Sequence, residues 1–523
     1  MDTKALRQKI LDLAIRGKLV PQDPADEPAS VLLERIRAEK QQMVKDGKLK
    51  AKDIKNDTVI YVGEDNLHYE KFSDGTVKCI EDEIPFEIPD GWAWARLLSI
   101  IEEKPTNGYS PKGVEYITDV RNLTLTATTS GFFKPNEFKY VDVKIAPDSK
   151  YWLRHNDILI QRSNSRELVG TSCIYDDKDA AFIFPDLMMK IHLMSGVEVK
   201  YIDWVLKSTL TREYYIANAT GSASSMPKIN QAIVANTLIP LPPCAEQKRL
   251  VRYLDEVMNI SNCIETGRRD ILELVSQAKA KILDLAIRGK LVPQDSADEP
   301  ASVLLERIRV DKEEQIKAGK IKRDKKESFI FRGEDNSYYE KIGDEMRCID
   351  DQLPFAIPEN WAWARLGSIF TLLSGRDLAP DDYNDEENGI PYITGASNFM
   401  NGQIGYYRWT TKPQVVSNYG DLLLTCKGTV GELAINTVGS IHIARQIMAI
   451  SGTSHFNQKY LLICIMAYIS RIRASAKGLI PGISREDILE LVLPIPPKRH
   501  QGLIAEKADS LLLLLETIEQ SLK

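Results

Sequence analysis

One block of sequence occurs twice in this chain, and the repeat constrains the fold more than any other feature. Residues 9–37 recur as residues 281–309, and the only difference is Pro24 in the first copy against Ser296 in the second. A chain built from two copies of one unit must form two related structures. The sequence therefore predicts a tandem duplication with pseudo-twofold internal symmetry.

A shorter aromatic block is repeated as well. In each copy two tryptophans alternate with alanine, the spacing that places both on one face of a β-strand. We expect a strand at the entry to a domain, with tryptophans that pack in a core rather than stack on bases. These tryptophans are Trp92, Trp94, Trp361 and Trp363.

Between the two copies of the aromatic block lies a long helical stretch, residues 246–309, in which no proline occurs before Pro293. Apolar residues recur three and four positions apart, the seam that one helix offers another. Residues 246–288 alone would form a rod of roughly 60 Å. The seam is formed by Leu250, Leu254, Val257, Ile260, Ile264, Ile271, Leu274, Ala278 and Leu285.

The segments at the two ends of the chain repeat the two halves of the helical stretch 246–309. Residues 3–16 predict an amphipathic helix that Gly17 ends, and residues 502–522 predict a second one. If both helices pack against the rod, we expect Lys4 and Leu522 to lie close together. A further helix is predicted from residue 31 to about residue 45, with Ser30 as its N-cap.

Two α/β domains of similar layout are predicted at residues 98–239 and 367–493. Short β-like runs at residues 157–160 and 421–425 lie among turn residues, and helical segments follow near residues 201–217 and 457–474. The fold class is α+β. The predicted segments are an N-terminal helical repeat (1–50), a first domain with its extension (51–240), a central spacer (241–320), a second domain with its extension (321–495) and a distal spacer helix (496–523).

Composition narrows the class of protein. The chain has 523 residues, of which 43% are hydrophobic and 27% charged, so we expect two to four soluble domains. No apolar run approaches the roughly 18 residues of a membrane span and no signal-peptide core is present, so we expect a cytoplasmic protein. Seven widely spread cysteines without a C-x-x-C pair predict buried free thiols. A net charge of −6 allows nucleic-acid binding only through local basic clusters.

Catalytic and cofactor motifs are not found in the sequence. Residues 241–244 and 495–498 lack the acid or amide and the aromatic residue of an amino-methyltransferase loop. Residues 426–431 fit neither the dinucleotide nor the phosphate-loop spacing, and no histidines stand at metal-ligand spacing. We expect no catalytic site, no metal and no cofactor on this chain.

Polar loops suited to reading a polymer recur at the same place in both domains. Arg, Asn and Gln side chains pair with base edges, whereas Ser and Lys contact phosphates, although a polar loop can also be a plain solvated turn. The loop after the strand ending at residue 160 offers Gln161, Arg162, Ser163, Asn164 and Arg166, and the equivalent loop offers Lys427 and Thr429. Candidate phosphate contacts are Ser222, Ser224, Ser225, Lys228 and Lys477, and weaker candidates are Tyr109, Arg121, Asn122, Arg376 and Asn398.

This arrangement resembles the specificity subunit of Type I restriction-modification systems over nearly the whole chain. The strongest motif is residues 239–248, supported by residues 221–230 and 156–160, whereas the second copy departs from the pattern at residues 482–484 and 498–501. The resemblance implies two target recognition domains, joined and separated by long antiparallel coiled-coil-like helices. Each would recognise one half of a split DNA sequence.

The same resemblance implies partners rather than catalysis. The helices would bind two methyltransferase subunits, which carry S-adenosylmethionine, and indirectly the endonuclease subunits, which use ATP and magnesium. Two other functions remain open. One is a self-contained methylation or restriction enzyme, and the other is a helical scaffold whose variable domains bind protein.

Overall fold

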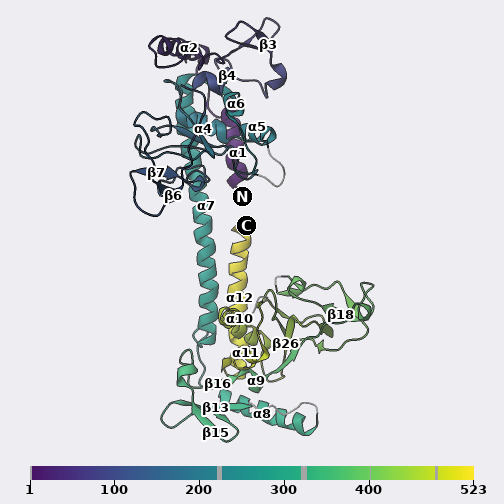
Figure 1. The fold of residues 1–523 in the computed structure, drawn as a ribbon. Helices are drawn as coiled ribbons and strands as arrows, with labels where there is room; N and C mark the ends of the chain where they lie inside the picture. Colours follow the sequence, from purple (N-terminus) through teal and green to yellow (C-terminus); the bar gives the residue numbers. More distant parts are fainter. Residues whose placement is uncertain (1–2, 221–225, 320–326, 401, 478–480, 523) are drawn as a thin grey trace. The chain divides into compact units, whose positions relative to one another are not determined.

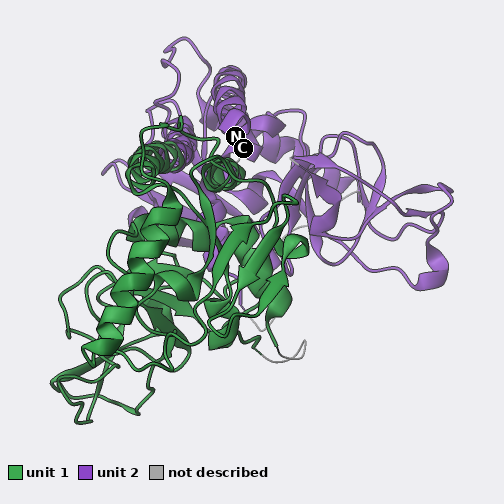
Figure 2. Cartoon of the chain, turned by 90° about the horizontal axis from the view of Figure 1, so that it is seen from above, with its two compact units in different colours: residues 1–267 green, residues 268–523 purple. Residues whose placement is uncertain are grey.

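The computed structural model describes residues 3–220, 226–319, 327–400, 402–477 and 481–522. The chain divides into two compact units, residues 1–267 and 268–523, which Figure 2 draws in green and purple. Each unit contains one copy of the repeated block and one of the predicted α/β domains.

The long helix is confirmed. Helix α7 (Cys244–Ile287) runs without interruption and joins the two units, its first part in unit 1 and the remainder in unit 2 (Figure 1). The helical stretch does not continue to residue 309, because a turn and a proline-containing loop intervene before α8 (Ala301–Lys317). Leu250 and Leu254 of the predicted seam are buried, whereas Ile260 and Leu274 near its middle are exposed.

Unit 1 combines helices with mainly antiparallel sheets. Its helices are α1 (Thr3–Ile15), α2 (Ala29–Lys45), α3 (Leu97–Ile100), α4 (Val199–Lys207), α5 (Thr209–Asn218), α6 (Gln231–Ala235) and the first part of α7. Its sheets are β1-β2-β3 (Val59–Val62, His68–Lys71, Val77–Cys79), β12-β4 (Leu238–Leu241, Ala93–Arg96), β10-β9-β11-β5 (Ser172–Ile174, Ile158–Gln161, Met188–Ile191, Thr106–Asn107) and β6-β8-β7 (Gly113–Val114, Phe138–Val141, Val120–Leu123).

Unit 2 repeats this plan. Its helices after α7 are α8, α9 (Leu366–Ile369), α10 (Gln458–Ala474), α11 (Arg485–Leu489) and α12 (Lys498–Leu522). Its sheets are β13-β14-β15 (Ser328–Arg332, Tyr338–Ile342, Glu345–Cys348), β16-β27 (Ala362–Arg365, Val492–Ile495), β17-β26-β23-β24 (Thr371–Ser374, Ile447–Ser451, Leu422–Thr425, Leu433–Ile435), β21-β18-β25-β22 (Trp409–Thr410, Ile390–Ile393, Ile441–Ile443, Val416–Ser417) and the hairpin β19-β20 (Phe399–Met400, Gln403–Ile404).

The central sheet has the same strand order in both units, since β10-β9-β11-β5 corresponds to β24-β23-β26-β17. The second sheet differs, with three antiparallel strands in unit 1 and four strands, including the parallel pair β18–β25, in unit 2. The prediction of two related but non-identical α+β domains is therefore confirmed.

The tryptophans lie in the cores, as predicted. Trp92, Trp94, Trp361 and Trp363 are all buried, and the second of each pair lies in the strand that closes the domain, β4 or β16. A buried ion pair holds the neighbouring three-stranded sheet to this strand. In unit 1 Arg96 pairs with Glu70, and in unit 2 Arg365 pairs with Glu340.

The repeated block makes the same contacts twice. Gly17 ends α1 with a φ of 66°, as predicted for a C-terminal glycine. Ser30 is not the cap of α2, because the helix already begins at Ala29 after Pro28, and the Ala29 N–H is satisfied by the Gly91 carbonyl at 2.8 Å.

Each terminal helix contacts α7 within its own unit. In unit 1, Arg7 of α1 donates to Ser261 at 2.9 Å and pairs with Glu265 at 2.7 Å. In unit 2, Lys279 of α7 pairs with Glu519 of α12 at 2.6 Å. The expected proximity of Lys4 and Leu522 involves both units and stays a prediction.

The seven cysteines are free thiols, as predicted, but not all are buried. Cys173, Cys426 and Cys464 are buried, whereas three others are exposed. The exposed residues are Cys79, Cys263 and Cys348. Two of these lie on the outer strand of a three-stranded sheet, β3 or β15, in which every residue is exposed.

Candidate nucleic-acid interface

In unit 1, three segments that are distant in sequence meet beside the end of strand β9. The hairpin loop 161–170 follows β9, and the Arg162 N–H donates to the Leu187 carbonyl at 2.8 Å just before β11. The Ile229 N–H donates to the Arg162 carbonyl at 3.0 Å, and Ser163 forms an isolated β-bridge with Lys228. The polar loop and the segment around residue 228 therefore lie side by side.

Unit 2 forms the same junction with different residues. The hairpin loop 425–431 follows β23, and the Ile483 N–H donates to the Cys426 carbonyl at 3.0 Å. Lys427 and Lys477 both form isolated β-bridges with Gly482. Because these backbone contacts repeat those of unit 1, Ser163 corresponds to Lys427, and Lys228 to Gly482.

A third segment reaches the same edge in each unit. The Tyr109 N–H, just after β5, donates to the Phe184 carbonyl at 2.8 Å, and the Arg376 N–H, just after β17, donates to the Ile443 carbonyl at 2.9 Å. The preceding glycines, Gly108 and Gly375, both donate to the start of the neighbouring strand. Tyr109 and Arg376 thus occupy equivalent positions, although the sequence singled them out only by residue type.

Seven of the predicted contact residues are exposed at or beside these junctions, and five of them carry positive charge. They are Tyr109, Arg166 and Lys228 in unit 1, and Arg376, Lys427, Thr429 and Lys477 in unit 2. Each edge therefore presents cations to solvent despite the negative net charge of the chain, as phosphate binding requires, next to exposed carboxylates such as Glu167 and Asp377.

Three of the predicted contact residues have amide groups that are buried and bonded within the domain. Gln161 donates to Thr128, Thr129 and the Leu125 carbonyl at 2.9–3.2 Å. Asn122 donates to the Tyr109 carbonyl at 2.9 Å, and Asn398 accepts from the backbone of residues 394 and 395. In this structure these side chains hold their loops, and their contact with DNA stays a prediction.

The remaining candidates differ in exposure, and three of them are not among the residues that the structure describes. Arg121 is half-buried, with its guanidinium 4.2 Å from the Phe182 ring centre, and Asn164 donates to Gln161 at 2.7 Å. Arg162 is half-buried and Ser163 is buried. Ser222, Ser224 and Ser225 lie outside the described residues.

Arginines that the sequence did not single out also lie at the two edges. Arg212 of α5 and Arg473 of α10 each contact the backbone of the hairpin loop, and Arg445 is exposed in the turn before β26. The only sequence signal for Arg212 and Arg473 is their position on the helix before the repeated signature. Many other polar residues share that position.

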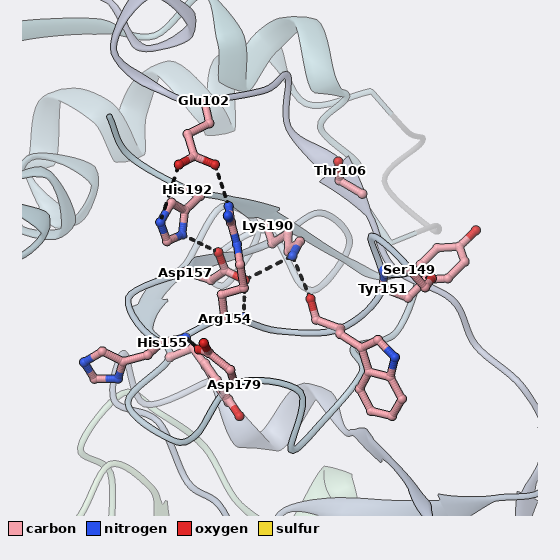
Figure 3. Close-up of polar contacts among 12 residues, drawn as sticks. Glu102, Thr106, Ser149, Tyr151, Arg154, His155, Asp157, Asp179, Lys190 and His192 are labelled. Carbon is pink, nitrogen blue, oxygen red and sulfur yellow. Dashed lines mark hydrogen bonds and ion pairs between the residues drawn. The ribbon is translucent and has the colours of Figure 1, made fainter. Parts of the chain in front are cut away.

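The start of β9 is fixed by a cluster of charges (Figure 3). Asp157 is fully buried and accepts from His192 Nδ1 at 2.8 Å, from Lys190 at 3.1 Å and from the Arg154 N–H at 2.8 Å. Glu102 pairs with Arg154 at 2.7 Å. Although burial opposes it, this hydrogen bond raises the pKa of the Arg154 guanidinium.

A cleft of about 380 Å³ beside this cluster is lined by Glu102, Lys190 and His192, among others. Both nitrogens of His192 face carboxylates, Asp157 at 2.8 Å and Glu102 at 3.9 Å. An imidazole held between two acids lacks the hydroxyl or thiol neighbour of a nucleophilic site. The cluster is therefore best understood as an anchor for β9.

Two wider observations concern the described parts of the chain. Among those residues, no helix combines the length and the apolar character needed to cross a membrane. Within the same residues, no three His, Cys, Asp or Glu side chains converge as a metal site would require.

Comparison with known proteins identifies the family. The sequence pattern described as the Type I restriction modification DNA specificity domain matches residues 111–274 and 358–523, more than half of the chain. The chain is 27% identical to the Type I restriction enzyme EcoAI specificity subunit of Escherichia coli, over 99% of this chain and 90% of that protein. It is 26% identical to the EcoEI specificity subunit of the same species, over 95% and 87%.

A solved structure has a similar fold. That structure concerns complex assembly and conformational transition of the type I R-M system, and the similarity covers 84% of this chain and 94% of that one, with a TM-score of 0.54 and 19% identity. Because the family pattern matches both units in turn, the chain belongs to the specificity subunits of Type I restriction-modification systems.

Proposed function

We propose that this chain recognises a bipartite DNA sequence, with one half read by each unit. The observation that carries the proposal is the pair of matching sheet edges. In each unit the hairpin loop, the segment after the helix and the segment after the first strand of the central sheet converge through the same backbone hydrogen bonds. Exposed cations line both edges, as phosphate neutralisation requires.

The two half-sites should differ in sequence, because equivalent positions carry different chemistry. The first hairpin loop is longer than the second, Tyr109 corresponds to Arg376, and Ser163 corresponds to Lys427. Base edges are distinguished by the donor and acceptor pattern of such side chains. Two domains of common architecture and different edges would therefore read two different sequences.

The helices would hold the partners. Ile260 and Ile264 in unit 1 and Leu274 and Leu513 in unit 2 are exposed apolar side chains on α7 and α12. Exposed apolar residues that gather on one helix face, as Ile260 and Ile264 do four positions apart, favour a protein partner. We propose that two methyltransferase subunits, carrying S-adenosylmethionine, bind here. Endonuclease subunits using ATP and magnesium would join indirectly, in the cytoplasm, and this chain would catalyse no step itself.

Binding of the chain, assembled with its methyltransferase partner, to duplexes from the source genome tests the proposal. We expect tight binding only to duplexes that contain both halves of one split sequence. Mapping N6-methyladenine in that genome would supply the two halves and their separation. Equal affinity for all duplexes would contradict the proposal and favour a protein-binding scaffold.

The enzyme alternative has a separate test. The purified chain alone is incubated with DNA and S-adenosylmethionine, and methyl transfer to DNA is measured. We expect none, and any transfer by the chain alone would establish an activity that the proposal excludes.

A further inference from the structure

In unit 1, one arginine ties the end of the hairpin loop to the neighbouring helix. Arg212 of α5 donates through Nη1 to the Val169 carbonyl at 2.5 Å and through Nη2 to the Glu167 carbonyl at 2.7 Å. A guanidinium is planar and rigid, so two such bonds fix both distance and orientation. The last residues of loop 161–170 are therefore held from outside the loop.

In unit 2, the helix in the equivalent position, α10, supplies an arginine to the same place. Arg473 of α10 donates through Nε to the Val430 carbonyl at 3.0 Å and through Nη2 to the Gly431 carbonyl at 3.4 Å. It also pairs with Glu432 at 3.3 Å. The contact recurs although the two loops differ in length and sequence.

A glycine in each loop makes room for this arginine. Gly170 has a φ of 78°, and a Cβ there would stand 2.4 Å from Tyr215 and 3.1 Å from Arg212. Gly431 has a φ of 94°, and a Cβ there would stand 2.8 Å from Arg473 Nε. Only glycine satisfies both the backbone angle and the close approach.

The equivalence of these glycines follows from the backbone. The Gly170 N–H donates to the Gln161 carbonyl at 2.7 Å, and the Gly431 N–H donates to the Thr425 carbonyl at 2.9 Å. Each bond closes a hairpin loop on the last residue of the preceding strand, β9 or β23. Arginine, glycine and loop closure thus form the same device in both units.

We infer that Arg212 and Arg473 are positioning residues for sequence recognition, each fixing the shape of one hairpin loop before DNA binds. The inference rests on the proposed function. Base discrimination requires side chains held in the right place, and a loop that must first be ordered loses affinity for the correct sequence. Contacts with phosphates tolerate more movement, because they depend mainly on charge.

The experiment replaces each arginine with methionine in the full chain assembled with its methyltransferase partner. Binding is measured to four duplexes: one with both half-sites, two in which one half-site is scrambled, and one in which both are scrambled. In R473M we expect the ratio of affinities for the intact and the scrambled duplex to fall about tenfold at the half-site that unit 2 reads. R212M should lose a similar factor at the other half-site only. Affinity for a duplex without either half-site should change less than discrimination does.

The chain offers a matched control for the removed charge. Arg471 lies on the same helix as Arg473 and is exposed, so R471M removes one positive charge without touching the loop. R471M should discriminate as the wild type does. R473K should restore part of the discrimination, because an ammonium group can donate to one carbonyl but cannot bridge two in a fixed plane.

Hydrogen exchange of the loop amides gives a readout independent of DNA. Residues 425–431 should exchange faster in R473M, and residues 161–170 in R212M, each without a change in the other loop. Unchanged discrimination in a variant whose wild type discriminates would overturn the inference and leave the proposed function intact. Loss of discrimination at both half-sites in a single variant would also overturn the inference, because it would indicate a general structural role for the arginine. A wild type without sequence preference would instead contradict the proposed function.

Discussion

At the scale of single residues, a buried glutamine explains the proline-rich motif that precedes each long helix. Gln247 donates to the Pro242 carbonyl at 2.9 Å and accepts from the Glu198 N–H at 2.8 Å. Gln501 repeats both contacts, with the Pro496 carbonyl at 3.1 Å and the Asn457 N–H at 2.8 Å. One side chain thus joins the strand, the helix after it and the helix of the α/β domain.

Replacing this glutamine should destabilise its unit. Q247L leaves a buried carbonyl and a buried N–H without partners, which costs about 1–3 kcal/mol. We expect a lower midpoint of urea unfolding for the unit that contains the change, and Q501L should act likewise on unit 2. The exposed Gln277 provides the control, because Q277L removes only a surface contact with Glu273. An unchanged midpoint in Q247L would show that the buried bonds contribute little.

The second copy replaces Glu246 by a histidine, and this gives unit 2 its own response to pH. Glu246 accepts from Trp92 at 3.0 Å, whereas His500 faces Gln294, which accepts from Trp361. Burial lowers the pKa of His500 below its ordinary value of 6.5, although Asp298 partly opposes the shift. The folded state therefore binds a proton less readily than the unfolded chain does.

The sign of the pH dependence follows from this shift. Below about pH 6.5 the unfolded chain takes up the proton first, so the stability of unit 2 falls as the pH decreases. His442, buried in the same unit with a pKa lowered by burial, acts in the same direction. We expect H500Q to lose less stability than the wild type between pH 7.5 and pH 5, measured by urea unfolding. An equal loss in both proteins would assign the acid sensitivity to other groups.

At the scale of elements, helix α7 contains a glycine near its middle that lowers its stability. Gly267 stands inside the helix, and a Cβ there would meet no atom within 4 Å. Glycine in a helix interior costs about 0.5–1 kcal/mol relative to alanine. G267A should therefore stabilise the helix around residue 267 and raise the midpoint of thermal unfolding of the chain. Amide exchange around residue 267 would measure the effect locally, and a faster rate in G267A would contradict it.

Elements with local signals could be predicted from the sequence, whereas the burial of polar side chains could not. The long helix, strand β9 and the end of α1 at Gly17 each follow from periodicity or from one residue's backbone preference. The burial of Gln161 depends on Thr128 and Thr129, more than thirty residues earlier in the chain. No local pattern specifies such a partner. Amides that could bind bases and amides that hold loops therefore look alike in the sequence.

At the scale of the whole molecule, the duplication separates what must be constant from what can vary. The repeated block contacts the same partners in both units. The Arg16 guanidinium lies 4.4 Å from the Phe86 ring centre, and that of Arg288 lies 4.6 Å from the Phe355 ring centre. The hairpin loops and the second sheets differ between units. A frame built twice from nearly identical sequence can thus present two unrelated surfaces for recognition.

The continuous helix between the units predicts how the distance between half-sites is set. Inserting seven residues after Gly267 would lengthen α7 by about 10 Å and keep the phase of its apolar seam. That length corresponds to about three base pairs of duplex. We expect the preferred separation of the half-sites to increase by about three base pairs, with the half-sites themselves unchanged. Binding of the assembled complex to duplexes of graded spacing measures this.

The control places an insertion of the same length at Gly75, an exposed turn where a Cβ would meet no atom within 4 Å. It adds residues without lengthening the helix, so the preferred separation should stay as in the wild type. An unchanged separation in the α7 insertion would mean that the helix does not set the spacing. The partner subunits would then position the two units on DNA instead. With the same duplexes, the preferred spacing would change with the methyltransferase that is used.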